Sequence, residues 1–152
     1  MLFAFLLAGC TGSSVLGAQT LDQLDTIQAL LDAHTEAVSA ATSMDDVTTL
    51  EADHSTAMGI AMEDMGGMMA DMMACDMGSM MDSMADADSH MQDMMSVPSA
   101  HAGAHSEHGT MDDCHVEEDD YAVQMGDHLD AMKADMMGFD AEASCSSGGG
   151  MM

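Results

Sequence analysis

The spacing of methionine is the feature that most limits what this chain can fold into. Between residues 58 and 95, fourteen of the 38 residues are methionine, and other large aliphatic side chains are almost absent. Steps of three, four or seven residues separate the members of two sets, which are Met58, Met62, Met65, Met69 and Met72, followed by Met77, Met80, Met84, Met91 and Met94. Such steps form one apolar stripe along an amphipathic helix. The second set is one residue out of phase with the first, so we predict two helices with a break at residues 76–79.

Two more segments carry an apolar stripe at helical spacing. The first stripe consists of Leu24, Ile27, Leu31, His34, Val38 and Ala41, and the second of Cys114, Glu118, Tyr121, Met125, His128, Met132, Met136 and Phe139. Residues 43–46 (Ser-Met-Asp-Asp) resemble a capping box, and the residue before Pro98 should avoid the helical region. We therefore predict an all-α, up-down-up-down four-helix bundle with helices at about residues 20–42, 44–74, 80–96 and 112–140.

The charge of the chain excludes one class of partner. The chain contains one lysine, Lys133, no arginine and 28 acidic residues, which gives a formal net charge of −27. Nucleic acid is excluded as a partner, because phosphate binding needs a basic patch. The acidity fits adaptation to high salt, where charge repulsion is screened, and it also fits attraction of cations. The sequence leaves both explanations open.

The N-terminus carries a targeting pattern. An apolar run at residues 2–8 is too short to span a bilayer and fits the apolar part of a secretory signal. The four residues Leu7-Ala8-Gly9-Cys10 resemble the lipobox of bacterial lipoproteins, although a basic segment ahead of it is missing. The resemblance implies a signal peptide at residues 1–9, a lipid anchor on Cys10, a tether at 10–19 and an outer-membrane location facing the periplasm.

Each predicted helix carries one histidine on or beside its apolar stripe. These are His34, His54, His90 and His128, and helix lengths at 1.5 Å per residue bring at least three of them near one level of the bundle. Met58, Met94 and Met125 lie within about one turn of them. Methionine is either a flexible core filler or a soft thioether ligand for Cu(I), and neutral imidazole suits copper as well. These histidines favour a copper site in the core.

The connection at residues 98–111 and the C-terminal tail complete the predicted organisation. The connection is predicted as a loop, and its histidines form a secondary set of candidate metal ligands: His101, His105, His108 and the adjacent His115. Residues 141–152 are predicted to be disordered. A disulfide is expected in an exported protein. Cys75 with Cys145 is the easier pairing in a bundle, which leaves Cys114 as a free thiol beside His115.

Known signatures of bundle enzymes are incomplete in this sequence. Glu51 and His54 form one E-x-x-H unit, whereas di-iron carboxylate bundles use two. The haem signature C-x-x-C-H is absent, and aromatic residues that could line a haem pocket are scarce. We therefore predict a non-enzymatic protein.

The exported, Met- and His-rich helical pattern resembles bacterial copper-storage and copper-buffering four-helix bundles. The resemblance implies Cu(I) bound in the bundle core, although those storage proteins use cysteine where this chain has methionine. Two other functions fit the sequence. One is a structural or interaction lipoprotein of a high-salt organism with methionine as core filler, and the other is a scavenger of oxidants through methionine sulfoxide.

Overall fold

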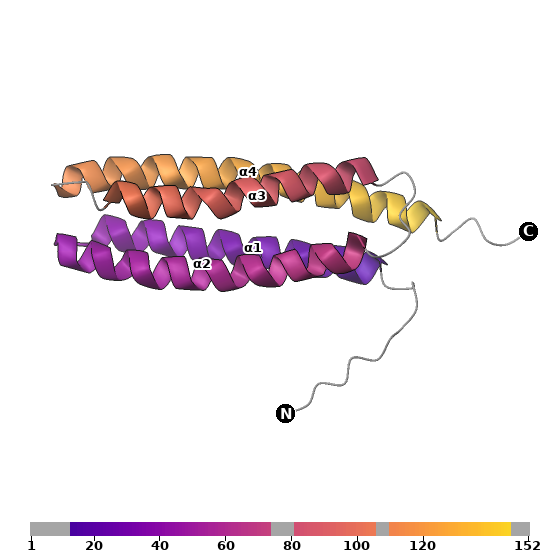
Figure 1. The fold of residues 1–152 in the computed structure, drawn as a ribbon, viewed down its shortest axis with the longest axis horizontal. Coiled ribbons are helices and arrows are strands. Elements are labelled where there is room, and N and C mark those ends of the chain that lie inside the picture. Colours follow the sequence, from indigo (N-terminus) through magenta and orange to yellow (C-terminus); the bar gives the residue numbers. More distant parts are fainter. Residues whose placement is uncertain (1–12, 74–80, 106–109, 147–152) are drawn as a thin grey trace, which may run out of the picture.

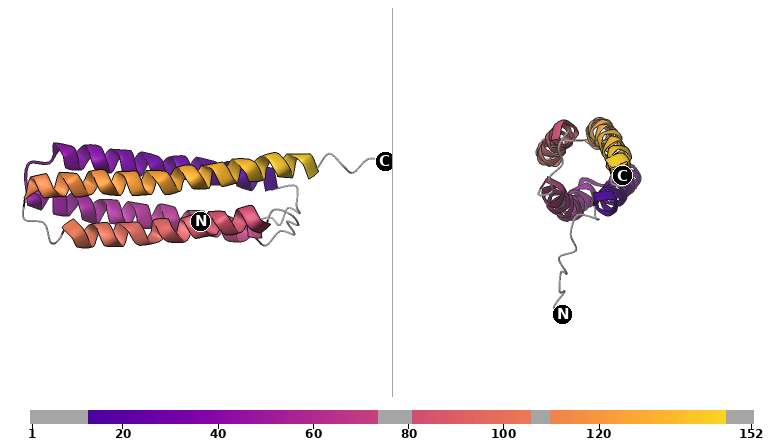
Figure 2. Two further views of the ribbon diagram at one scale, coloured as in Figure 1. Left: turned by 90° about the horizontal axis from the view of Figure 1, so that it is seen from above. Right: turned by 90° about the vertical axis from the view of Figure 1, so that its right-hand side faces the viewer.

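The computed structural model describes residues 13–73, 81–105 and 110–146, and these residues form four α-helices. They are α1 (Ser13–Ala40), α2 (Met44–Met73), α3 (Met81–His105) and α4 (Met111–Ser146). The helices run up and down in sequence order, with α1 and α2 in one layer and α3 and α4 in the other (Figure 1). Viewed end-on, they occupy the corners of a square, so each helix packs against two neighbours (Figure 2). The predicted four-helix bundle is confirmed.

Two helix starts are fixed by capping side chains. The Ser43 hydroxyl accepts a hydrogen bond from the backbone N–H of Asp46 at 3.2 Å and donates to the Asp46 carboxylate at 2.6 Å. Thr110 makes the same pair of contacts with Asp113, at 3.2 Å and 2.6 Å. Each cap satisfies a backbone donor that has no partner inside the helix. The two capped starts, those of α2 and α4, lie at the same end of the bundle, beside the C-terminal ends of α1 and α3 (Figure 2).

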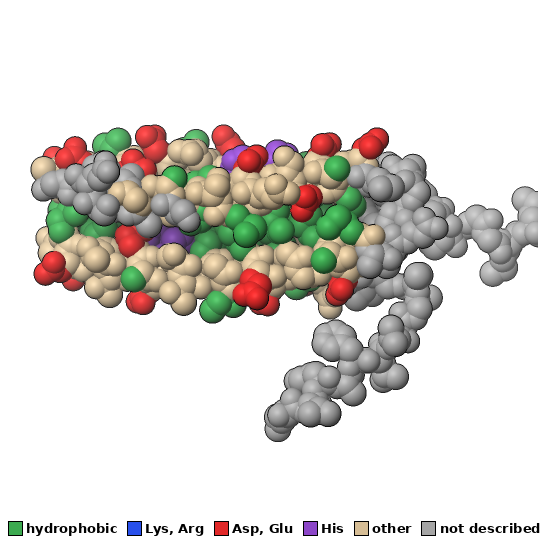
Figure 3. Space-filling view, in the orientation of Figure 1, with side chains coloured by type: hydrophobic (Ala, Val, Ile, Leu, Met, Phe, Trp, Pro, Cys, Tyr) green, Lys and Arg blue, Asp and Glu red, His purple; other side chains and the backbone are tan. Residues whose placement is uncertain are grey.

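Methionine forms most of the core, as the stripe spacing predicts. The methionines of the α2 stripe are all buried, and they pack against buried aliphatic residues of α1 and α4 and further buried methionines of α3 and α4. The cluster consists of Leu24, Ile27, Leu31, Met58, Ala61, Met62, Met65, Met69, Met72, Met84, Ala87, Met94, Tyr121, Met125, Leu129, Met132 and Met136. Most of the acidic side chains in view lie on the outer surface, and a band of hydrophobic side chains is visible between α2 and α3 (Figure 3).

Three helix boundaries differ from the prediction. Helix α1 begins at Ser13, so much of the expected tether is helical, and α4 runs to Ser146, into the expected disordered tail. The largest correction concerns α3, which continues through Pro98 to His105 where a loop was expected. Proline removes one backbone hydrogen bond from a helix, and the buried contacts of His101 with Glu51 and Glu118 compensate for that loss.

Several predicted features fall outside the described part of the chain. They are the lipobox-like residues 7–10, the expected break at 76–79, Cys75 and His108. The side chains of His105 and Cys145 are not described either, although both residues belong to helices. Among the described helices, none combines the length and apolar character that crossing a membrane requires.

Candidate metal centre

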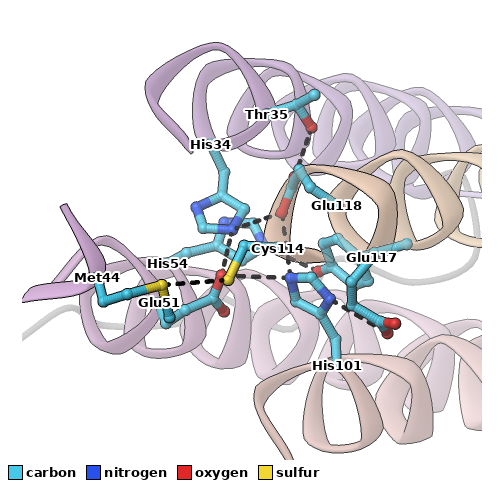
Figure 4. Close-up of polar contacts among 10 residues, drawn as sticks. His34, Thr35, Met44, Glu51, His54, His101, Cys114, Glu117 and Glu118 are labelled. Atoms are coloured by element: carbon cyan, nitrogen blue, oxygen red, sulfur yellow. Dashed lines mark hydrogen bonds and ion pairs between the residues drawn. The ribbon is translucent and has the colours of Figure 1, made fainter. Parts of the chain in front are cut away.

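Four side chains, one from each helix, converge inside the end of the bundle where the caps lie. They are His34 of α1, Glu51 of α2, His101 of α3 and Glu118 of α4, and all four are buried (Figure 4). Each residue lies within about two helical turns, roughly 11 Å, of the helix terminus at that end. One ligand atom from each side chain lies within 4.8 Å of the other three. Two imidazoles and two carboxylates therefore face one point.

The ligand atoms alternate around a closed ring. The Nε2 atom of His34 lies 3.1 Å from Oε1 of Glu51 and 3.3 Å from Oε2 of Glu118. The Nε2 atom of His101 lies 3.3 Å and 3.1 Å from the same two oxygens. Neighbouring ligand atoms in a tetrahedral site with bonds of about 2.1 Å are about 3.4 Å apart. The four adjacent nitrogen–oxygen distances are therefore within a few tenths of an ångström of those in a four-coordinate site.

In the absence of metal the ring is a set of buried ion pairs. Burial alone would lower the pKa of His34, but the hydrogen bonds to Glu118 and Glu51, together with their charges, raise it to about 9. His101 is also buried, and the same two carboxylates raise its pKa. Burial opposes ionisation of Glu51, yet hydrogen bonds from His101 and His34 lower its pKa to about 2. The pKa of Glu118 is lowered in the same way. These shifts favour two imidazolium groups that balance two carboxylates.

Neighbouring side chains hold the four ligands in place. The Thr35 hydroxyl donates to Oε1 of Glu118 at 2.8 Å and leaves the other oxygen to face the ring. The imidazole of His34 stacks on that of His54, with 3.9 Å between ring centroids, and His101 stacks on Tyr121 at the same distance. Such contacts orient metal ligands and tune their basicity. The orientations of the two imidazoles are therefore fixed by these neighbours as well as by the contacts with Glu51 and Glu118.

His54 and Tyr121 form a buried pair beside the ring. The His54 Nε2 atom lies 2.8 Å from the Tyr121 hydroxyl. Burial and the charge of His34 lower the pKa of His54 to about 4, and burial raises the pKa of Tyr121. Both groups are therefore neutral at physiological pH and share one hydrogen bond. His54 supports the site as a stacking partner and does not belong to the four-residue group.

The structure separates the other predicted ligands from this site. His90 and His128 lie together in a second group farther along α3 and α4, and His115 belongs to neither group. Met58, Met94 and Met125 are fully buried members of the methionine core. The Cys114 thiol, predicted to lie beside His115 as a free thiol, is buried and contacts the sulfur of Met44 at 3.6 Å (Figure 4). The predicted cluster of four histidines with methionine is thus divided between two places.

Two of the four converging residues were not predicted as ligands. Glu51 and Glu118 stand at stripe positions of their helices, where apolar residues are expected. A glutamate at such a position is rarely buried unless it is paired. That mismatch was the signal that could have identified them from the sequence. His101 was predicted only as a loop ligand, and the continuation of α3 carries it into the core.

No protein-family model, curated protein sequence or solved structure matches this chain. The function is therefore inferred from the arrangement of these side chains. Two imidazole nitrogens and two carboxylate oxygens are donors that first-row transition metals accept.

Proposed function

We propose that this protein binds and buffers a divalent transition-metal ion at the ring formed by His34, Glu51, His101 and Glu118. The observation that carries the proposal is the convergence of four ligand atoms from four helices within 4.8 Å of one another. The charges support it, because a divalent ion that displaces one proton from each imidazole leaves the buried charge unchanged. An ion can therefore replace two protons without adding net charge to the interior.

The proposed role is to hold the ion. A structural metal site uses four protein ligands, whereas a catalytic site keeps a coordination position open for water or substrate. Here all four ligands come from the protein and all are buried. Because the ligands come from all four helices, binding also stabilises the fold, as for any ligand that binds only the native state.

The donor set favours a divalent ion over Cu(I). Cu(I) prefers thiolate and thioether ligands, whereas carboxylate and imidazole suit Zn²⁺ and Cu²⁺. The adjacent ligand distances in the ring are close to those around Zn²⁺, and the general order of affinities places Cu²⁺ above Zn²⁺. We therefore propose copper in its Cu(II) state, with Zn²⁺ as the competing ion.

The pattern at residues 7–10 supports a location in the cell envelope. Recovery of a mature chain that begins at lipidated Cys10 would test this location.

A surface hollow lies near the ring. A hollow of about 400 Å³ lies between α2 and α3, and it is lined by Ser55, Met58, Gly59, Met62, Glu63, Met95 and Pro98. Ser55 directly follows His54 on α2, and Pro98 lies one turn before His101 on α3. The hollow therefore lies about one helical turn along α2 from Glu51 and along α3 from His101, and we propose it as the side from which an ion enters.

A competition titration with a metal-indicator chelator tests the proposal and distinguishes binding by the ring ligands from binding by methionine. We compare the wild type, His34→Gln/His101→Gln and Met58→Leu/Met94→Leu/Met125→Leu with Zn²⁺, Cu²⁺ and Cu(I). The methionine variant should keep its affinity for divalent ions, because leucine replaces methionine in a core at a cost under about 1.5 kcal/mol per site. The histidine variant should lose tight binding at the ring. If the histidine variant binds as many Zn²⁺ or Cu²⁺ ions as wild type, with the same affinities, the proposed ligands are wrong.

A further inference from the structure

A second cluster of ligand-type side chains lies on the face that α3 and α4 share. It consists of His90 and Asp93 of α3 and His128 of α4, and one ligand atom from each lies within 4.8 Å of the other two. His90 and His128 are half-buried and Asp93 is exposed, whereas the residues of the ring are all buried. Histidine side chains are visible next to an acidic group on the surface of the α3–α4 layer (Figure 3).

The antiparallel packing of α3 and α4 explains why these residues meet. His90 and Asp93 are three residues apart and therefore share one face of α3. Asp135 is seven residues, or two turns, beyond His128 on α4, and its Oδ2 atom lies 3.9 Å from Nε2 of His90. The imidazole rings of His90 and His128 lie 5.8 Å apart, at an angle of 53°. Two imidazoles and two carboxylates therefore line one short stretch of the helix interface.

Two polar atoms at this place, one in His90 of the cluster and one in the adjacent Asp135, lack hydrogen-bond partners in the described part of the chain. Nδ1 of His90 and Oδ2 of Asp135 are shielded from solvent, and neither makes a hydrogen bond to any group in the described part of the chain. Buried polar atoms are normally satisfied, so each exception needs an explanation. A bound ion would satisfy such an atom.

We propose that His90, Asp93 and His128 form a second, solvent-facing site for a divalent transition-metal ion, with Asp135 as an adjacent carboxylate. Three protein ligands leave coordination positions for water, so this site exchanges its ion faster than the closed ring. Asp93 and His90 precede His101 by eight and eleven residues, which places the two sites about 12–17 Å apart along α3. The second site therefore binds its ion independently of the ring.

The experiment measures both the number of ions bound and the rate at which they leave. The full chain is loaded with Zn²⁺ in a buffer with excess Mg²⁺, which occupies sites made of carboxylates alone. A chromophoric chelator then removes the ion, and wild type should release one equivalent rapidly and one slowly. His90→Gln/His128→Gln should lose the rapid equivalent, with affinity for it reduced more than about tenfold because direct ligands are lost.

Two further variants make the assignment specific. His115→Gln removes a histidine that belongs to neither cluster, and it should keep both equivalents. Glu118→Gln alters only the ring, and it should keep the rapid equivalent and lose the slow one. If wild type releases only a rapid equivalent that His90→Gln/His128→Gln lacks, the second site stands and the ring is overturned as a metal site.

Other outcomes overturn the second site. If His90→Gln/His128→Gln releases the same rapid equivalent as His115→Gln, then His90 and His128 are not its ligands. If wild type releases no rapid equivalent, the second site does not bind Zn²⁺. The altered residues are partly exposed, so helix content and melting temperature should match those of wild type in every variant except Glu118→Gln. The single variant Asp93→Asn provides the same test if the double variant does not fold.

Discussion

Replacing Glu118 with glutamine is expected to abolish tight metal binding at the ring and to destabilise the metal-free protein by about 3 kcal/mol. The Glu118 side chain is only 2% exposed, and its Oε2 lies 3.1 Å and 3.3 Å from Nε2 of His101 and His34. Glutamine has almost the same volume but no charge. The substitution therefore leaves two buried imidazoles facing a single carboxylate, and removal of one partner from a buried ion pair is strongly destabilising.

Glu117 provides a matched control for this substitution. Its Oε1 lies 3.9 Å from Nδ1 of the same His101, but its side chain is 30% exposed. Glu117→Gln should change the free energy of unfolding by less than about 1 kcal/mol, because exposed ion pairs contribute little. Urea unfolding with and without Zn²⁺ measures both effects. Zn²⁺ at about a hundred times the Kd of the ring should add about 2.7 kcal/mol through the ring to the stability of wild type and Glu117→Gln. Equal metal-induced stabilisation of Glu118→Gln would exclude Glu118 as a ligand.

Metal binding at the ring is expected to release about two protons per ion at neutral pH, and its affinity should rise up to about a hundredfold per pH unit. The physical reason is competition, because the ion needs the neutral form of both imidazoles. The carboxylates raise the pKa of His34 to about 9, and they raise the pKa of His101 in the same direction. Calorimetric titration in two buffers with different ionisation enthalpies counts the protons released. A release near zero would show that the ion does not bind these two imidazoles.

The metal-free protein should respond to pH in the opposite direction. The pKa of His34 rises from 6.5 to about 9 on folding, so its contribution to stability is complete below pH 6.5 and is lost as pH rises through 9. The pKa of Glu51 falls from 4.5 to about 2, so its contribution is complete above pH 4.5 and is lost as pH falls through 2. The contribution of the ring should therefore be greatest between pH 4.5 and 6.5. The stabilisation by Zn²⁺ should grow from pH 6.5 towards 9.

The fold could be predicted because its signals are local. The stripes of α2 and α4 follow from residue spacing, and Ser43 caps α2 as its sequence pattern indicates. Helix α3 was predicted to end ahead of Pro98 because proline disfavours a helical conformation in the residue before it. Contacts between distant residues override that preference, since His101 reaches Glu51 and Glu118 only if the helix continues. A single sequence read locally does not contain that information.

The site could be predicted only in part, for the same reason. His34 was predicted correctly to face the core, but ending α3 nine residues early displaced its predicted end by about 14 Å. That error brought His90 to the level of His34 in the prediction, whereas His101 occupies that place in the structure. The abundance of methionine directed the prediction towards thioether ligands. In the structure the methionines of the α2 stripe are core residues, and carboxylates complete the ring.

X-ray absorption at the zinc edge tests the central proposal most directly. His90→Gln/His128→Gln loaded with one equivalent of Zn²⁺ leaves the ring as the remaining proposed site. The proposal predicts four nitrogen or oxygen neighbours at about 2.0–2.1 Å, with the outer-shell scattering of two imidazoles and no sulfur near about 2.3 Å. A sulfur shell would point to methionine or cysteine as ligands. A shell of oxygen alone would assign the ion to the acidic surface, and either result would contradict the ring as the metal centre.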